Sequence, residues 1–587
     1  MKTDYLSADV ARDLDQHKKR KHFLSLIRLV LFVGMVATFI LGLTDLPWLL
    51  LAFVALVAVF FRMVLVYSEN KDRISFLEQI LEMQKEASLR KNRDLKGFDA
   101  GLDFLDKSHP FANDLDLFGQ HSLFQLLNHT VGKEGRQRLA DWMKGQMEPG
   151  PARKRQGAIN GLKDHLDFVR DFEGIGRAFL TGEKSKKPFY LWLAKSEDWK
   201  AWYYLPMIVG PLGGLLFLVL GIMEVVQIAW LGIWILLGMA CMSVIFLKMK
   251  TISESMPNLS DLKTFKKWVL LLENISFKDS YLIALQSGFL TKDVKGSNVL
   301  AELEQKTFLL QNRYNLMYLL LNMFLWFDFF LYFKALRWKA NHGHLMADWE
   351  ERFTEWQVLV SLAAFSNEEM LDNMPDWTEK NSIVAKNIKH PLLRSDLAIG
   401  NDFALDAGTK TILLTGSNMS GKTTFMRTLG INMVLSNMGL GIFGIDFQIG
   451  SYWLFTSMRN TDNLGESVSS FYAELGRIKN LLDMAARGQA VFYLLDEILK
   501  GTNTLDRVMG SEALIRQLSE SACKGIISTH DIELSQLEQK LPFVLNKSFH
   551  SQIFEDKIHF DFTLKEGPCP SFNAHKLMEL MGIKFEE

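Results

Sequence analysis

The sequence is poor in cysteine and has no excess of charge of either sign. Its 587 residues include 3 cysteines, Cys241, Cys523 and Cys569, without paired spacing or a neighbouring histidine cluster. This pattern argues against a disulfide framework or a zinc site and favours a reducing compartment. The 66 Lys and Arg residues are balanced by 67 Asp and Glu residues. No global basic field therefore indicates a nucleic-acid partner.

Apolar residues are concentrated in two pairs of long runs. The first pair covers 23–43 and 47–61, and the second covers 204–223 and 228–247. Each run approaches the roughly 20 residues that a helix needs to cross a bilayer. Lys and Arg flank the outer ends of the pairs, whereas the turns around Asp45 and Glu224 contain neither, which is the positive-inside pattern. A cleaved signal peptide or buried core helices would not produce two hairpins with matching charge asymmetry.

These runs predict four transmembrane helices in two hairpins. The protein is then a multi-pass protein of the cell (inner) membrane, with its soluble domains and both termini in the cytoplasm. Between and after the hairpins, 68–203 and 251–370 are charged and helix-patterned, with apolar residues at steps of three and four. Internal repeats, low-complexity tracts and long flexible linkers are absent from the sequence, which predicts closely packed domains.

The pattern of residue types along the chain changes near Asn381. Short β-branched runs bounded by Gly, Asn and Pro then alternate with helical stretches to about residue 583, as in an α/β domain with a largely parallel sheet. One such run, 411–415, leads into a glycine-rich segment and then a helix-forming stretch. The segment contains Gly416, Ser417, Asn418, Met419, Ser420, Gly421, Lys422, Thr423 and Thr424.

This segment has the P-loop spacing, between the strand and the helix that the motif requires. Its glycines let backbone N–H groups turn toward phosphates, and the helix N-terminus adds a favourable dipole. The spacing predicts ATP binding, with Lys422 on the phosphates and Thr423 as a ligand of Mg²⁺.

Two further strand ends carry side chains suited to hydrolysis. The apolar strand at 490–495 ends in Asp496 and Glu497. Next to a P-loop, Asp496 is expected to hold Mg²⁺ and Glu497 to polarise the attacking water. His530 follows another strand, where an imidazole can reach the γ-phosphate. A lone histidine is more often a surface or core residue, and position alone leaves both interpretations of His530 open.

A fifth apolar run, 316–333, is interrupted by Asn322 and Asp328. A carboxylate in the middle of a membrane is costly. A fifth span would also place the P-loop outside the cell, away from ATP. The run is therefore predicted to be a buried or interface-hugging helix.

The order and spacing of these motifs resemble the MutS mismatch-repair ATPases. The resemblance is carried by 415–427, 462–475, 494–506 and 528–537, and it extends to an entry strand at Lys389–Leu393 and a closing helical segment at Ser571–Ile583. A weaker similarity to the start of the MutS core domain lies at His121–Met143. The resemblance implies an α/β P-loop ATPase of the ABC/MutS type that follows a mainly helical core region.

The resemblance also implies a head-to-tail homodimer in which each subunit completes the site of the other. Asn418, Lys422, Thr423, Asp496, Glu497 and His530 match the cis site. Ser469 and Ser470, before Phe471 and Glu474, match the signature that the partner presents to the γ-phosphate. The loop that crosses the dimer interface in MutS corresponds to Gly501, Thr502 and Asn503. Glu466 and Ser467 stand where the family usually has Ser-Gly, and the missing glycine removes a close backbone approach to phosphate.

The sequence departs from mismatch readers in lacking a Phe-x-Glu reading domain and a DNA clamp of the usual length. Two hypotheses remain for what the ATPase acts on. In the first, the protein still binds mismatched or structured DNA in mismatch repair, through Lys133, Arg136, Arg138, Arg153, Lys154 and Arg155. In the second, a membrane-tethered ATPase acts on a protein partner without DNA. An ABC-transporter half fits less well, because the Leu-Ser-Gly-Gly-Gln signature is absent.

The predicted organisation has six segments. They are a basic cytosolic stub (1–22), a first hairpin (23–67), the first part of the helical core-like region (68–203), a second hairpin (204–247), the second part of that region (248–375) and the ATPase domain (376–587).

Overall fold

The computed structural model of the chain describes residues 7–44, 46–182, 184–223, 225–290, 295–379, 382–417, 419–459, 470–554 and 557–570. Its residues form two compact units. Unit 1 consists of Met1–Gln84, Val131–Gly135 and Asp167–Gln357, and unit 2 of Lys85–Thr130, Arg136–Leu166 and Val358–Glu587. These units cut across the predicted segments, whose boundaries stay a prediction.

Unit 1 contains two helical hairpins. The first pairs α1 (Ser7–Thr44) with α2 (Leu49–Lys91), and the second pairs α8 (Tyr204–Ile222) with α9 (Ile228–Ser255). Among the described residues, these 4 helices are long and apolar enough to cross a membrane. Their large apolar side chains are mostly exposed. Length and composition thus agree with the four predicted spans.

The fifth apolar run forms two helices instead of the single one predicted. α13 (Leu316–Leu325) and α14 (Phe327–His342) meet at Trp326, whose φ is 50°, and the pair is bent by 97°. Asp328 is buried at the break and accepts hydrogen bonds from Arg313 Nε at 3.0 Å and from the Tyr318 hydroxyl at 2.7 Å. Its backbone N–H donates to Asn322 Oδ1 at 2.8 Å. Asn322 and Asp328, the two polar residues that interrupt this run, thus have partners within the protein.

The rest of unit 1 is a helical core around aromatic side chains. The Trp268 ring stacks on Phe172 with centroids 4.2 Å apart, and its indole N–H donates to Phe172 O at 2.7 Å. The helices that form this core are α6 (Leu166–Phe179), α7 (Lys187–Ala194), α10 (Leu259–Glu273), α11 (Ser280–Ser287), α12 (Gly296–Gln311) and the part of α15 (Trp349–Glu368) that ends at Gln357.

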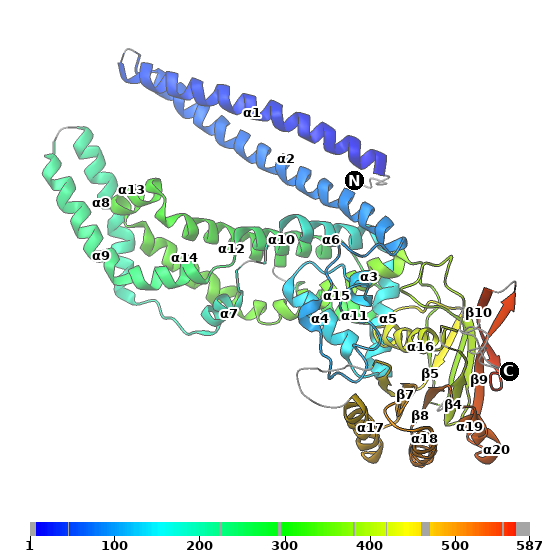
Figure 1. Cartoon of the computed structure of the whole chain (residues 1–587). Helices are drawn as coiled ribbons and strands as arrows, with labels where there is room; N and C mark the ends of the chain where they lie inside the picture. The colour runs from blue at the N-terminus through cyan, green and yellow to red at the C-terminus, as the bar shows by residue number, and fades with distance from the viewer. Residues whose placement is uncertain are drawn as a thin grey trace. The chain divides into compact units, whose positions relative to one another are not determined.

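Unit 2 is built on a 6-stranded sheet of order β10-β9-β4-β8-β7-β6 (Figure 1). All neighbours are parallel except β9 and β10, which agrees with the predicted largely parallel sheet. Helices pack on both faces of this sheet. Its strands are β4 (Thr411–Thr415), β6 (Trp453–Ser457), β7 (Val491–Asp496), β8 (Lys524–Thr529), β9 (Val544–Phe554) and β10 (Lys557–Glu566), and the helices are α16 (Lys422–Asn437), α17 (Ser470–Ala486), α18 (Thr504–Ser519), α19 (Ile532–Ser535) and α20 (Leu537–Lys540).

A second sheet of 4 strands has the order β1-β5-β2-β3. Its strands are β1 (Asp376–Trp377), β2 (Ile383–Ile388), β3 (Asn401–Leu405) and β5 (Asp446–Ile449). The entry strand predicted at Lys389–Leu393 is wrong, because the strand ends at Ile388 and a turn follows. Pro391 has no N–H for a ladder and restricts the residue before it.

The segment after α2 belongs to unit 2 and carries α3 (Leu123–Leu127), most of α4 (Lys133–Lys144) and α5 (Pro149–Lys163). Asp114 from this segment accepts hydrogen bonds from Thr456 Oγ1 at 2.7 Å and Met458 N at 3.1 Å. Asp116 pairs with Arg427 of α16 at 3.1 Å. Charge-assisted bonds thus tie residues far apart in sequence to the sheet that carries the site.

Candidate nucleotide-binding and hydrolysis site

The P-loop connects β4 to α16. β4 is buried throughout, as expected for an inner parallel strand covered on both faces. Gly416 has φ 151° and Gly421 has φ 106°, and a Cβ at Gly416 would lie 2.7 Å from the Phe549 carbonyl oxygen. Glycine is therefore required at position 416 by close approach and at 421 by the left-handed backbone. Met419, with φ 68°, is 83% exposed at the tip of the loop.

Lys422 begins α16 and lies inside the loop. Its ammonium donates to Gly416 O at 2.8 Å and to Ser417 O at 3.0 Å. Burial lowers the pKa of Lys422, and the nearby carboxylates of Glu497 and Asp496 oppose that shift. Thr424 follows on the exposed side of the first helical turn.

The hydroxyls of Ser417 and Ser420 are buried and have no hydrogen-bond partner among the described residues. A buried hydroxyl without a partner costs about 1–3 kcal/mol. These two donors and the backbone N–H groups of the loop suit phosphate oxygens. The residues present therefore fit a nucleotide phosphate.

Thr423 and Asp496 come together as the magnesium site predicted from the sequence requires. Thr423 Oγ1 donates to Asp496 Oδ2 at 2.5 Å, and the Ser528 hydroxyl donates to Oδ1 of the same carboxylate. No group of three or more His, Cys, Asp or Glu side chains suited to a metal occurs among the described residues. Mg²⁺ in nucleotide sites needs only one or two protein oxygens besides phosphates and water, so this pair fits the ion.

Glu497 lies one residue beyond β7 with φ 51°, and its backbone N–H donates to Ser528 O at 3.1 Å. Its Oε1 lies 2.7 Å from His530 Nε2, and its Oε2 forms an ion pair with Lys500. These contacts, that with His530 above all, lower the pKa of Glu497 to about 2. The carboxylate is thus anionic at neutral pH, and both of its oxygens are engaged.

The structure adds residues that the sequence reasoning missed. Lys500 stands three positions after Glu497, and this spacing was its only sequence signal. Ser528 lies in the strand before His530 and binds both members of the acidic pair, through a hydrogen bond to Asp496 and one from Glu497 N at 3.2 Å. Arg507 of α18 makes two 2.7 Å contacts with Asp531.

The loop after Glu497 is supported by α17 of the same chain. Glu474 accepts a hydrogen bond from Leu499 N, and burial raises the pKa of Glu474. A Cβ at Gly501 would lie 2.5 Å from Phe471 Cβ. Asn503 caps α18 by accepting from Asp506 N at 2.9 Å. Thr502 lies between these supports. Phe471 and Glu474 therefore position the loop within one chain.

Several predicted residues lie outside the described part of the structure. They are Asn418, Glu466, Ser467 and Ser469, together with the side chain of Ser470 and the closing segment 571–583.

Known proteins are similar to the region of the chain that carries this site. Residues 412–583 match the family model described as MutS domain V. The C-terminal region of this chain is similar to MutS domain V. In MutS proteins this domain is the ATPase. The match includes the P-loop, Asp496, Glu497 and His530.

Curated relatives named DNA mismatch repair protein MutS are similar to part of this chain. The protein of Lawsonia intracellularis is 28% identical over 236 residues, or 39% of this chain and 26% of the relative. That of Lactobacillus delbrueckii subsp. bulgaricus is 28% identical over 259 residues, covering 43% and 30%. That of Nitratidesulfovibrio vulgaris is 28% identical over 246 residues, covering 40% and 26%. The chain thus spans less than a third of the length of these MutS proteins.

Proposed function

We propose that this protein is a membrane-anchored, MutS-like ATPase that hydrolyses ATP with Mg²⁺ in a homodimer. The observation that carries the proposal is the meeting of Thr423 with Asp496, 2.5 Å apart, at the sheet edge where Lys422 and Glu497 also lie. Position by position, the P-loop binds phosphate, Thr423 and Asp496 hold Mg²⁺, and Glu497 orients water. When bound, Mg²⁺ would neutralise the charge that develops on the phosphate oxygens.

Glu497 acts as the water-orienting group only after one of its oxygens is freed. A carboxylate with a pKa of about 2 is a weak proton acceptor at neutral pH. Glu497 contributes a fixed negative charge and a fixed geometry, and His530 and Lys500 hold its carboxylate in place. Release of the exposed Lys500 would free Oε2 for water, while His530 stays near the γ-phosphate position.

Dimerisation is supported by apolar side chains around the site. Tyr472 is 71% exposed on α17, and Leu505 and Met509 of α18 are 67% and 62% exposed. They flank the loop of Gly501 and Asn503, which the resemblance places at the dimer interface. Large apolar side chains exposed beside one loop suit an interaction surface.

Membrane anchoring is supported by α1, α2, α8 and α9, each with an 18-residue window of mean hydropathy from 1.9 to 2.8. The proposed location is the cell (inner) membrane, with both termini and the ATPase in the cytoplasm. Both hairpins belong to unit 1.

One proposal is that ATP hydrolysis is coupled to the binding of mismatched or structured DNA. Some of the basic residues predicted to bind this DNA already contact other groups of the protein. Arg136 is bound by the carboxylates of Asp99 and Asp103. Arg153 donates to Trp377 O at 2.9 Å and Arg155 to Asn437 O at 3.1 Å. These contacts favour the second candidate function, a membrane-tethered ATPase that acts on a protein partner without DNA.

The test is the ATPase rate of the detergent-solubilised chain, with Mg²⁺ and with homoduplex, mismatched or branched DNA at one salt concentration. Turnover in the wild type that Lys422→Ala abolishes supports the proposed ATPase activity. No turnover in the wild type would refute that activity. Stimulation by one DNA structure that fades with salt supports the DNA load. A rate indifferent to every DNA supports the second function.

A further inference from the structure

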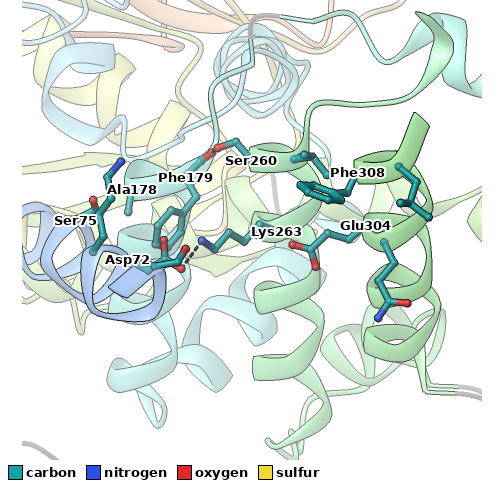
Figure 2. Close-up of a pocket in the computed structure, with 13 residues that line it drawn as sticks. Asp72, Ser75, Ala178, Phe179, Ser260, Lys263, Glu304 and Phe308 are labelled. Atoms are coloured by element: carbon teal, nitrogen blue, oxygen red, sulfur yellow. Dashed lines mark hydrogen bonds and ion pairs between the residues drawn. The ribbon is translucent and has the colours of Figure 1, made fainter. Parts of the chain in front are cut away.

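Unit 1 contains a cavity of about 840 Å³ that lies beside α2, just beyond its apolar stretch. Residues of α2, α6, α10 and α12 line it, and Figure 2 shows Asp72 and Ser75 on one side and Glu304 and Phe308 on the other. Sites for small molecules usually measure about 300–1,000 Å³. The cavity is therefore large enough for a ligand of that class.

The α2 wall is polar and adjoins the proposed membrane span. Ser68, Lys71, Asp72 and Ser75 line the cavity at the spacing of one helical face. They follow directly after the predicted first hairpin, which ends at Tyr67, and α2 continues without a break to Lys91. A ligand in the cavity thus contacts this helix at the level where the headgroups of a bilayer would lie.

The α12 wall of the cavity becomes apolar toward the C-terminal end of α12, which leads to α13. Phe308 and Leu309 line the cavity and are 55% and 36% exposed. After Asn312–Tyr314 the chain enters α13, where Leu316, Leu319 and Leu320 are also exposed. One side of the cavity therefore suits an apolar chain, while the other suits a polar head.

The charged groups in the lining are balanced. Lys71 and Lys263 contribute two positive charges to the lining, and Asp72 and Glu304 contribute two negative charges, so the lining residues sum to zero, while Lys266 outside the lining forms an ion pair with Glu304. Lys263 forms an ion pair with Asp72, seen as the dashed line in Figure 2, and their side chains remain 25% and 22% exposed. A purely anionic head gains little net attraction here, whereas a head with both charges finds a partner for each.

We propose that this cavity binds a zwitterionic glycerophospholipid with a primary ammonium head. Its phosphate lies toward Lys71 and Lys263, its ammonium donates to Asp72 and Glu304, and one acyl chain follows Phe308 and Leu309. An ammonium has three N–H donors for carboxylates, which a quaternary amine lacks. The lipid bridges α2 to α10 and α12. This inference rests on the proposed membrane anchoring.

The experiment uses the full chain in lipid nanodiscs that contain phosphatidylethanolamine with a photo-activatable group on its head. After irradiation, the labelled peptides are mapped by mass spectrometry. We expect labelling of 68–75, 259–263 and 304–309. A second probe with the group on the acyl chain reports on 23–61. If neither probe labels the chain, the membrane anchoring fails; if only 23–61 is labelled, the lipid site alone fails.

A variant that fills the cavity makes the test specific. Ser75→Trp should abolish head-group labelling of the cavity peptides and leave acyl labelling of 23–61 intact. Leu270→Trp is the matched control, because Leu270 is a half-exposed residue of α10 outside the lining. Unlabelled phosphatidylethanolamine should compete better than phosphatidylcholine or phosphatidylglycerol. Equal competition by all three, stronger competition by phosphatidylglycerol, or competition by inorganic phosphate would overturn the proposal.

Discussion

Thr423 Oγ1 donates a 2.5 Å hydrogen bond to Asp496 Oδ2, across 73 positions of sequence. The two prospective magnesium ligands thus lie within hydrogen-bonding distance of each other. Ser528 holds the second oxygen of Asp496, so both oxygens of the carboxylate are positioned by hydroxyl groups of the protein. Such pre-positioning lowers the cost of ordering a metal site.

Glu497→Gln separates nucleotide binding from hydrolysis. The amide keeps the size of the side chain and loses the negative charge that orients water. We expect ATP affinity to stay within about twofold and turnover to fall by about 10²–10⁴-fold, the usual contribution of such a group. Equilibrium binding and steady-state hydrolysis measure the two effects. Normal turnover in this variant would show that another residue orients the water.

Lys500→Ala tests whether Lys500 restrains Glu497. Removal of the ion pair raises the pKa of Glu497, since Lys500 is one of the groups that lower it. We expect hydrolysis at subsaturating ATP to rise, because Oε2 no longer has to be released before it meets water. Lys479→Ala, on α17, is the control. A fall in turnover comparable to that of Glu497→Gln would instead assign Lys500 a direct role at the phosphates.

Acid should destabilise the protein partly through Glu497. Its pKa is about 2 in the folded chain, against 4.5 for the free side chain. The lowered pKa stabilises the fold fully above pH 4.5, and this contribution is lost as the pH falls from 4.5 toward 2. We expect the melting temperature of the wild type in detergent to fall more between pH 5 and about pH 3.5 than that of Glu497→Gln. An equal fall in both proteins would contradict the contacts described for Glu497.

Gly214→Val should disrupt the packing of α13 on α8. A Cβ at Gly214 would lie 2.3 Å from the Phe324 carbonyl oxygen, and backbone cannot move aside as a side chain does. We expect a destabilisation of about 1–3 kcal/mol, as for other overpacked positions, read as a lower melting temperature in detergent. Gly232→Val on α9 is the control, because nothing lies within 4 Å of its added Cβ. Equal melting temperatures for the two variants would argue against this contact.

Membrane topology follows from the count of spans. Reporters placed beside Leu46 and Val225, between the helices of each hairpin, should be accessible from outside the cell, and one after Glu587 only from inside. The bent pair α13–α14 adds a fifth crossing only if it traverses the membrane. An external C-terminal reporter would therefore reveal that crossing and exclude the four-span arrangement.

Local pattern determined much of this protein. The strand–loop–helix context of the P-loop is contained within 411–437, and glycine at 421 is required by its own backbone angle. The four apolar runs need only length and composition to predict helices of membrane-spanning size. Asp496 and Glu497 were recognisable because they end an apolar strand next to a P-loop in the chain's motif order.

Only the tertiary structure decided which charges meet. His530 approaches Glu497 because the neighbouring parallel strands β7 and β8 end at one sheet edge, and no local pattern encodes that contact. The same holds for Arg136, whose basic character suggested DNA until Asp99 and Asp103 were found beside it. The bend at Trp326 was missed because its left-handed backbone is compensated by packing and by the buried Asp328, which are long-range contacts. Sequence periodicity thus fixes elements and motifs, whereas side-chain partners depend on surfaces that exist only after the chain has folded.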